Sequence, residues 1–181
     1  MAASGQIAII GFKGCGKSTI GRMLAEKLDL AFQDTDEILE NMYQRKTGDA
    51  LSFREIYVRH GRGYFEELEA EAVGQALGGE GKVISFGGGS LITVDAKSMD
   101  VGRTKFVYLT AQANVLFDRI VAQGIPAFFS TNDPRASFEQ LLEKRRPIYE
   151  KYATITIDNS YTSPEDTVRE LEAELKSKGL I

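Results

Sequence analysis

The stretch GFKGCGKS, Gly11–Ser18, decides the fold of this chain. It follows the pattern G-x-x-x-x-G-K-[ST], in which glycines let the backbone curl so that successive N–H groups point inward at a phosphate. Before it, Gln6–Ile10 is a short apolar run typical of a strand, and after it Thr19–Leu28 carries its apolar residues on one helical face. Because the motif belongs between a strand and a helix, this context predicts a phosphate-binding loop and not a chance glycine-rich turn.

The loop predicts a nucleoside triphosphate as ligand, with ATP and Mg²⁺ as the cofactors. Lys17 is expected to reach the outer phosphates, and Ser18 to offer its hydroxyl to Mg²⁺. Lys13 and Cys15 occupy variable positions of the motif, so we expect their side chains to fill space and not to do chemistry. The expected nucleotide-binding residues within the loop are Gly11, Gly14, Cys15, Gly16, Lys17, Ser18 and Thr19.

Composition limits the possible partners of the chain. The 181 residues are enough for one domain, residues 1–181, with a sizeable core. A net charge of −4 is the wrong sign for binding nucleic acid or an anionic membrane surface. One cysteine and one histidine exclude an internal disulfide and a structural zinc cluster, so any metal must be held by oxygen. No targeting segment is evident, and we expect a cytoplasmic, monomeric protein that takes a small-molecule substrate.

Strand and helix patterns alternate along the whole chain. Helical spacing recurs between the expected strands, and Ser163 with Pro164 marks the start of the last helix. The alternation predicts a three-layer α/β/α fold with a five-stranded parallel sheet, whose ligands bind beyond the carboxyl ends of the strands. The strands expected after the first are Ala31–Gln33, Lys82–Phe86, Lys105–Leu109 and Thr154–Ile157.

Two further segments carry polar or flexible residues at the carboxyl ends of expected strands. Asp34 and Asp36 follow the second strand on alternate positions, so one carboxylate can face Mg²⁺ and the other the acceptor. The alternative is a solvated acidic turn. Gly87–Gly89 follows the third strand and would bring three N–H groups close to a ligand, although a flexible turn is the alternative.

Taken together, these residues resemble the shikimate kinase family, a branch of the nucleoside monophosphate kinase fold. The resemblance implies transfer of a phosphoryl group from ATP to a hydroxyl of shikimate. The segments that carry it are Gly11–Ser18, Thr19–Ala25, Phe32–Asp36, Gly87–Gly89, Arg119 and Arg145–Tyr149.

The resemblance also implies a role for each matched residue. Asp34 would serve the metal through water, and Asp36 would bind the acceptor hydroxyls and orient the attacking oxygen. Arg119 would cover the adenine and approach the phosphates, with Pro164 as the other wall of the base pocket. The implied catalytic residues are Lys17, Asp36 and Arg119, and the implied substrate-binding residues are Asp36, Gly87, Gly88, Gly89 and Arg145.

The chain departs from the family pattern at two arginines. The family sequence G-E-x-x-F-R reads GRGYFE at residues 61–66, which puts Glu66 where an arginine binds the acceptor carboxylate. The family lid sequence R-P-L-L reads IPAF here, so Ile125 stands in place of the lid arginine. Arg145 is the third family arginine and is retained. Candidates to replace the lost cations are Arg62, Arg59 and Arg135.

Glu66 therefore allows two interpretations. It can line the acceptor pocket, which favours a polyol or amino alcohol without a carboxylate as the acceptor. Alternatively, it lies on a solvated acidic face with Glu67, Glu69 and Glu71.

Residues 124–137 are irregular, and we expect them to form a lid that closes over bound nucleotide. A non-catalytic, nucleotide-binding regulator is a further alternative to a kinase. A GTPase is excluded, since the chain has neither the D-x-x-G nor the N-K-x-D sequence.

Overall fold

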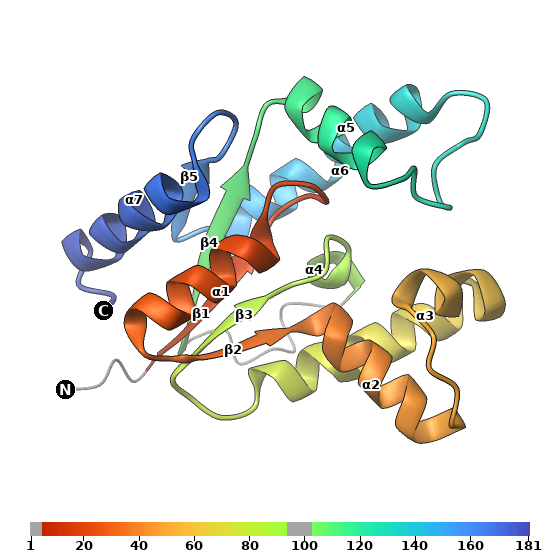
Figure 1. The fold of residues 1–181 in the computed structure, drawn as a ribbon, viewed down its shortest axis with the longest axis horizontal. Coiled ribbons are helices and arrows are strands. Elements are labelled where there is room, and N and C mark those ends of the chain that lie inside the picture. Colours follow the sequence, from red (N-terminus) through yellow and green to blue (C-terminus); the bar gives the residue numbers. More distant parts are fainter. Residues whose placement is uncertain (1–4, 94–102) are drawn as a thin grey trace.

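The computed structural model describes residues 5–93 and 103–181, which form a three-layer α/β/α fold (Figure 1). The strands are β1 (Gln6–Ile10), β2 (Ala31–Asp34), β3 (Lys82–Ser85), β4 (Thr104–Thr110) and β5 (Ile155–Asp158). The helices are α1 (Lys17–Leu28), α2 (Thr35–Thr47), α3 (Phe53–Leu77), α4 (Ser90–Thr93), α5 (Ala113–Ala122), α6 (Pro134–Tyr152) and α7 (Pro164–Ser177).

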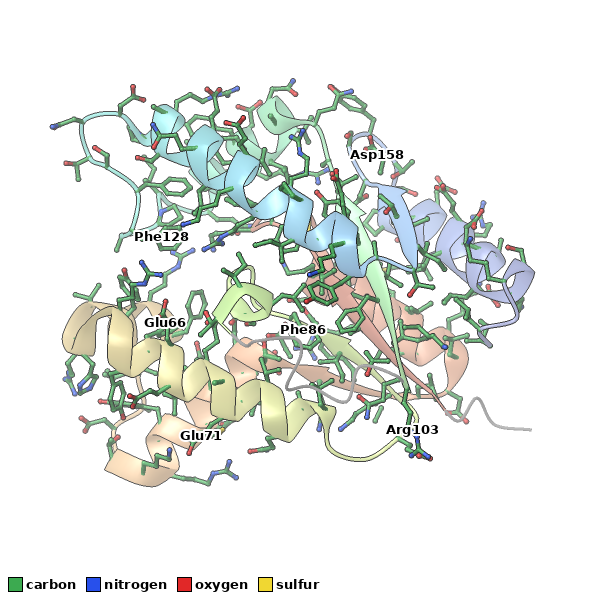
Figure 2. All side chains as sticks on the ribbon, turned by 180° about the vertical axis from the view of Figure 1, so that it is seen from behind. Glu66, Glu71, Phe86, Arg103, Phe128 and Asp158 are labelled. Carbon is green, nitrogen blue, oxygen red and sulfur yellow. The ribbon has the colours of Figure 1, made fainter. Side chains whose placement is uncertain are left out.

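The five strands form one parallel sheet in the order β2-β3-β1-β4-β5. Strand β1 is central, with Ile9 opposite Ser85 of β3 and Val107 of β4. Helices α1 and α7 pack together on one face of the sheet (Figure 1), and α3 and α6 cover the other face (Figure 2). All residues of β1 and β3 are buried, as expected for strands between two helical layers.

Local sequence signals explain where several helices begin. Ser52 caps α3 and forms a capping box with Glu55, and Ser163 caps α7, where Pro164 is the first helical residue. Helix α3 is broken at Gly61, whose φ of 78° and ψ of −179° are essentially restricted to glycine. The break divides α3 into a short first segment and a longer second one.

The predicted fold class is confirmed, and all five strands occur within a residue or two of the expected bounds. Helices α2 and α4 were not predicted. The buried residues Ile38, Leu39, Met42 and Tyr43 of α2 follow a helical spacing that would have revealed it. Residues 124–133 connect α5 to α6, and the last four residues of the predicted lid, 134–137, form the first turn of α6.

Among the residues that the structure describes, no helix is both long and apolar enough to cross a membrane.

Candidate active site

The glycine-rich loop connects β1 to α1 and is held in a fixed shape by backbone contacts. A Cβ on Gly11 would come within 2.2 Å of the carbonyl oxygen of Leu109, so only glycine fits there. Gly14 and Gly16 have φ angles of 84° and 95°, in the left-handed region that favours glycine. The side-chain amide of Asn159 donates to the carbonyl of Cys15 at 2.9 Å. The close approach of β4 and the hydrogen bond from the residue after β5 therefore help to fix the shape of the loop.

The loop places its lysine and serine at the entrance to α1. The Lys17 ammonium group donates to the carbonyl of Phe12 at 3.0 Å. The Ser18 hydroxyl donates to Oδ2 of Asp34 at 2.6 Å and lies 3.3 Å from the hydroxyl of Ser85. Cys15 is buried and contributes only its backbone to the loop surface.

The oxygen atoms beside the loop fit a magnesium ion. Mg²⁺ in kinases is held by one or two protein oxygens together with phosphate and water, and Ser18 with Asp34 supplies such a pair. No group of three or more His, Cys, Asp or Glu side chains within the described residues is arranged to hold a metal ion. Phosphate and water would therefore have to provide most of the ligands.

Asp36 lies beyond the end of β2, in the first turn of α2. Burial, assisted by the negative charge of Asp34, raises the pKa of its carboxyl group to about 7. Its backbone N–H donates to Oδ1 of Asp34 at 2.9 Å, which caps α2. A Cβ on Gly87 would come within 2.5 Å of Oδ1 of Asp36, so glycine at this position makes room for the carboxylate.

A second wall of the site is built around Gly88 and Gly89. The carbonyl of Gly88 accepts hydrogen bonds from Nη1 of Arg145, at 3.1 Å, and from the hydroxyl of Tyr149. Glu69 is buried below this wall and accepts a hydrogen bond from Ser90 at 2.9 Å. Burial raises the pKa of the Glu69 carboxyl group, and the nearby Arg145 charge opposes that shift.

Arg119 and Pro164 lie at the opposite end of the site, beside the glycine-rich loop. The Arg119 guanidinium donates to the carbonyls of Asn159 and Ser160 at 2.9 and 3.2 Å. A third, longer contact of 3.4 Å joins it to the carbonyl of Gly14. These three carbonyls hold the guanidinium plane in one orientation.

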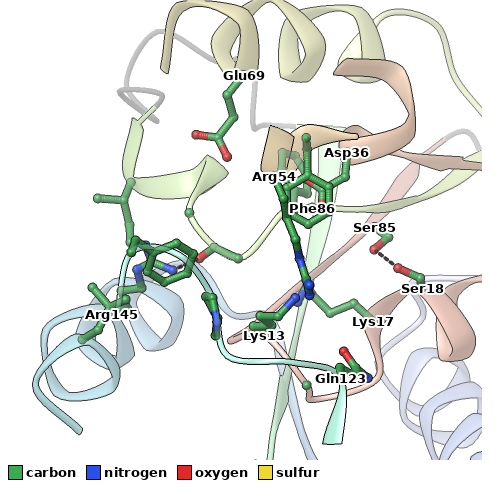
Figure 3. Close-up of a pocket in the computed structure, with 18 of the residues that line it drawn as sticks. Lys13, Lys17, Ser18, Asp36, Arg54, Glu69, Ser85, Phe86, Gln123 and Arg145 are labelled. Atoms are coloured by element: carbon green, nitrogen blue, oxygen red, sulfur yellow. Dashed lines mark hydrogen bonds between the residues drawn. The ribbon is translucent and has the colours of Figure 1, made fainter. Parts of the chain in front are cut away.

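One cavity of about 1000 Å³ is bordered by the glycine-rich loop, Asp36, the Gly88–Gly89 wall and the Arg119–Pro164 end of the site (Figure 3). Its lining includes most of the residues predicted from the sequence: Gly14, Gly16, Lys17, Ser18, Thr19, Asp36, Glu66, Gly88, Gly89, Arg119, Arg145 and Pro164. The lining does not include Gly11, Cys15, Asp34 or Gly87, each of which lies next to a residue that does line the cavity.

Glu66 borders the cavity and does not belong to a separate solvated face. Its side chain, 38% exposed, accepts a hydrogen bond from Nε of Arg62 at 2.7 Å. Figure 2 shows it on α3, across the gap from Phe128, and both residues line the cavity. Of the three candidate replacement arginines, Arg62 alone lines the cavity, while Arg59 pairs with Asp49 and Arg135 with Glu139.

The sequence model of the family described as "Shikimate kinase" matches residues 13–176. The chain belongs to the shikimate kinase family. A shikimate kinase of Symbiobacterium thermophilum is 34% identical over 176 residues, which cover 96% of this chain and 97% of that protein.

Solved structures of shikimate kinases share the fold. A crystal structure of the enzyme from Aquifex aeolicus is 30% identical, covers 97% of this chain and 98% of its own, and superposes with a TM-score of 0.75. The enzyme from Acinetobacter baumannii, in complex with shikimate, is 24% identical with a TM-score of 0.87 and covers 99% and 97% of the two chains. As a member of this family, the chain is an ATP-dependent phosphotransferase.

Sequence reasoning missed part of this shikimate kinase-family site. Lys13, which we expected only to fill space, lines the cavity, as do Phe53, Arg54 and Tyr57 from the first segment of α3. The capping box at Ser52 would have located the start of α3, but no sequence pattern shows which side chains of that helix face a ligand.

Proposed function

We propose that this chain transfers the γ-phosphoryl group of ATP to a hydroxyl of shikimate. The observation that carries the proposal is the position of Asp36, on the lining of the same cavity as Lys17 of the phosphate loop and the Arg145 wall. A donor on one side and a hydroxyl acceptor on the other would meet beside this carboxylate. Such positioning, together with charge neutralisation, is the main requirement of phosphoryl transfer.

Each group then has one task. Lys17 binds the outer phosphates, and the N–H groups of Gly14–Ser18 bind their oxygens at the N-terminus of α1. In its ionised form Asp36 accepts the hydrogen of the attacking hydroxyl and directs the oxygen lone pair at the phosphorus. Arg119 lies over the nucleotide, with Pro164 as the opposite wall. Arg145, at the Gly88–Gly89 wall, is the cation that would bind the acceptor carboxylate.

Ser18 and Asp34 are the residues that would hold Mg²⁺, Ser18 directly and Asp34 through water. The ion would neutralise negative charge on the phosphates during transfer. Single-domain organisation over residues 1–181, the monomeric state, the cytoplasmic location and lid closure by residues 124–137 stay predictions from the sequence.

The charge of Glu66 decides between shikimate and a second class of acceptor, a polyol or an amino alcohol without a carboxylate. A carboxylate on the cavity lining attracts a cation, and it repels an acceptor carboxylate unless another charge balances it. Arg62 provides that balance through its ion pair with Glu66, which makes the pair electrically neutral. A neutral pair leaves Arg145 free to bind a carboxylate, which supports shikimate, whereas a broken pair would favour a polyol or an amino alcohol.

Coupled ADP release distinguishes the two acceptors. We expect saturable turnover with shikimate, and loss of carboxylate affinity in Arg145→Ala, seen as a rise in KM of roughly 100-fold for a lost charge-assisted contact. Glu66→Gln is the matched test of the second class, because it removes the negative charge with little change of shape. Turnover that is stimulated by amino alcohols but not by shikimate, and that Glu66→Gln abolishes, would contradict the proposal.

A further inference from the structure

Three cationic side chains meet in the middle of the cavity. Lys13 comes from the glycine-rich loop, Lys17 from the start of α1, and Arg54 from the second position of α3. Burial lowers the pKa of Lys13, and the charges of Arg54 and Lys17 lower it further, while Asp36 acts in the opposite direction. Figure 3 shows Arg54 extending from the side of Asp36 toward Lys13 and Lys17.

Arg54 differs from the other arginines of α3 because no carboxylate of the described residues pairs with it. Arg59 is paired with Asp49 and Arg62 with Glu66. Within residues 5–93 and 103–181, neither Arg54 nor Lys13 forms an ion pair. Two unpaired, partly buried cations beside a third repel one another, and the charge of Asp36 offsets only part of this repulsion. An anion with several charges would therefore stabilise the arrangement.

Phe53 holds the two unpaired cations in place. The guanidinium carbon of Arg54 lies 5.9 Å from the centre of the Phe53 ring, and the ammonium nitrogen of Lys13 lies 5.7 Å from the same centre. Both distances are within the range of cation–π attraction. Nη1 of Arg54 also lies 3.9 Å from the position that a Cβ on Gly124 would take, at the start of the segment between α5 and α6.

The position of Arg54 fits the transferred phosphoryl group and not the acceptor carboxylate. Arg145, with Gly88, Gly89 and Glu69, occupies a separate wall of the cavity (Figure 3). Arg54 instead lies beside Lys13, which is also close to Lys17 and Asp36, and all four side chains line the same cavity. Lys17 and Asp36 are the two groups between which a phosphoryl group has to pass. In that transfer, negative charge is spread over three equatorial oxygens, and the planar guanidinium group can donate to two of them at once.

We propose that Arg54, assisted by Lys13, contacts the phosphoryl group during its transfer and stabilises the charge on its equatorial oxygens. The segment that begins at Gly124 brings Pro126, Ala127 and Phe128 to the cavity lining, and residues 124–133 contain no arginine, so the cation is supplied from α3 and not from the lid. This inference rests on the proposed phosphoryl transfer from ATP, but not on the identity of the acceptor.

The test uses three variants of the full chain: Arg54→Ala, Arg54→Lys and, as control, Arg103→Ala. Arg103 is an exposed arginine with a single partner, Glu80, and it does not line the cavity. We expect kcat in Arg54→Ala to fall by about 10²–10³-fold, as for the loss of an arginine that contacts the transition state. The Kd for ATP should change less than about threefold, because the contact forms chiefly during transfer. Arg54→Lys should recover part of the rate, and Arg103→Ala should match the unmodified chain.

Two readouts need no acceptor. The slow hydrolysis of ATP, which is transfer to water, should fall in Arg54→Ala, and so should the affinity for ADP with magnesium and aluminium fluoride, which mimics the transferring group. A kcat within threefold of the unmodified chain, or unchanged affinity for the fluoride complex, would overturn the inference. If shikimate is not phosphorylated at all, the proposed acceptor fails, yet these two readouts still decide the role of Arg54.

Discussion

At the scale of single residues, Asp34 and Asp36 show how position divides two identical side chains between two tasks. Asp34 is buried, accepts a hydrogen bond from Ser18 and caps α2, while Asp36 lines the cavity. Their alternate spacing after a strand was visible in the sequence and predicted two different roles. The sequence could not predict that burial and the Asp34 charge would raise the pKa of Asp36 to about 7.

This pKa predicts a pH dependence of the reaction. The carboxyl group of Asp36 is ionised above pH 7 and protonated below it, and the protonated form cannot accept the hydrogen of the acceptor. We therefore expect kcat/KM to be constant above a pH of about 7 and to fall roughly tenfold per pH unit below it. The measurement is of initial rates between about pH 5 and 9, a range that brackets this midpoint.

The control for this profile is Asp36→Asn. This variant should bind ATP with normal affinity and show no turnover at any pH, since the amide cannot accept the proton. A profile whose midpoint lies near 4, the usual range of an aspartate, would contradict the raised pKa, and an active Asn variant would contradict the role of Asp36.

At the scale of elements, the strands were predictable because buried parallel strands read as short apolar runs, as in Lys82–Ser85. Helix α2 was not predicted, because its start depends on Asp34 acting as an N-cap, and that residue was interpreted only as a metal-site residue. The orientation of Glu66 also lay beyond sequence reasoning, since it depends on how α3 packs against the rest of the molecule.

The segment 124–133 has one anchored and one exposed aromatic residue. Phe129 is buried, and its ring centre lies 6.4 Å from that of Phe138. Phe128 is 46% exposed, and its ring centre lies 6.4 Å from that of Tyr57. The anchor fixes the middle of the segment, and the exposed ring lines the cavity.

Hydrogen exchange tests whether this segment closes. With an unreactive ATP analogue, magnesium and the acceptor, we expect amide exchange in residues 124–133 to slow by about tenfold or more, because closure excludes water from these N–H groups. Residues of β1, which are buried in either state, serve as the internal control. Equal exchange rates with and without the ligands would show that the segment is not a lid.

At the scale of the whole molecule, the order of the strands builds the site. Strands β2, β3 and β1 are neighbours, so the loops that follow them lie side by side at one edge of the sheet (Figure 1). This edge carries Asp34 at the end of β2, Asp36 in the first turn of α2, Gly87–Gly89 and the phosphate loop. The sequence predicted a parallel sheet and each loop separately, but strand order arises from long-range packing that no local pattern records.

Ligand binding at this edge should stabilise the whole fold. MgATP at about 100 times its Kd should add roughly 2.7 kcal/mol to the free energy of unfolding. For a chain of this size, that corresponds to a rise in Tm of about 5–11 °C. Thermal unfolding with MgATP, with ATP and EDTA, and with the Lys17→Ala variant measures the effect.

The rise should be smaller without the metal, and in Lys17→Ala it should nearly vanish, because this lysine binds the outer phosphates. A Tm of the unmodified chain that does not respond to saturating MgATP would argue against nucleotide binding by the Gly11–Ser18 loop.

The break in α3 at Gly61 separates the part of the helix proposed to face the phosphoryl group from the part that faces the acceptor. The eight residues before it carry Phe53, Arg54 and Tyr57, and the longer part after it carries Glu66 and Glu69. No atom lies within 4 Å of the place where a side chain at Gly61 would begin, so the positive φ angle, and not a lack of space, is what requires glycine there. The torsion angles of Gly61 thus set the distance between Arg54, which faces the phosphoryl group, and the carboxylates of Glu66 and Glu69. A change of these angles would alter the size of the acceptor that fits, while the phosphate loop on the other side of the cavity keeps its shape.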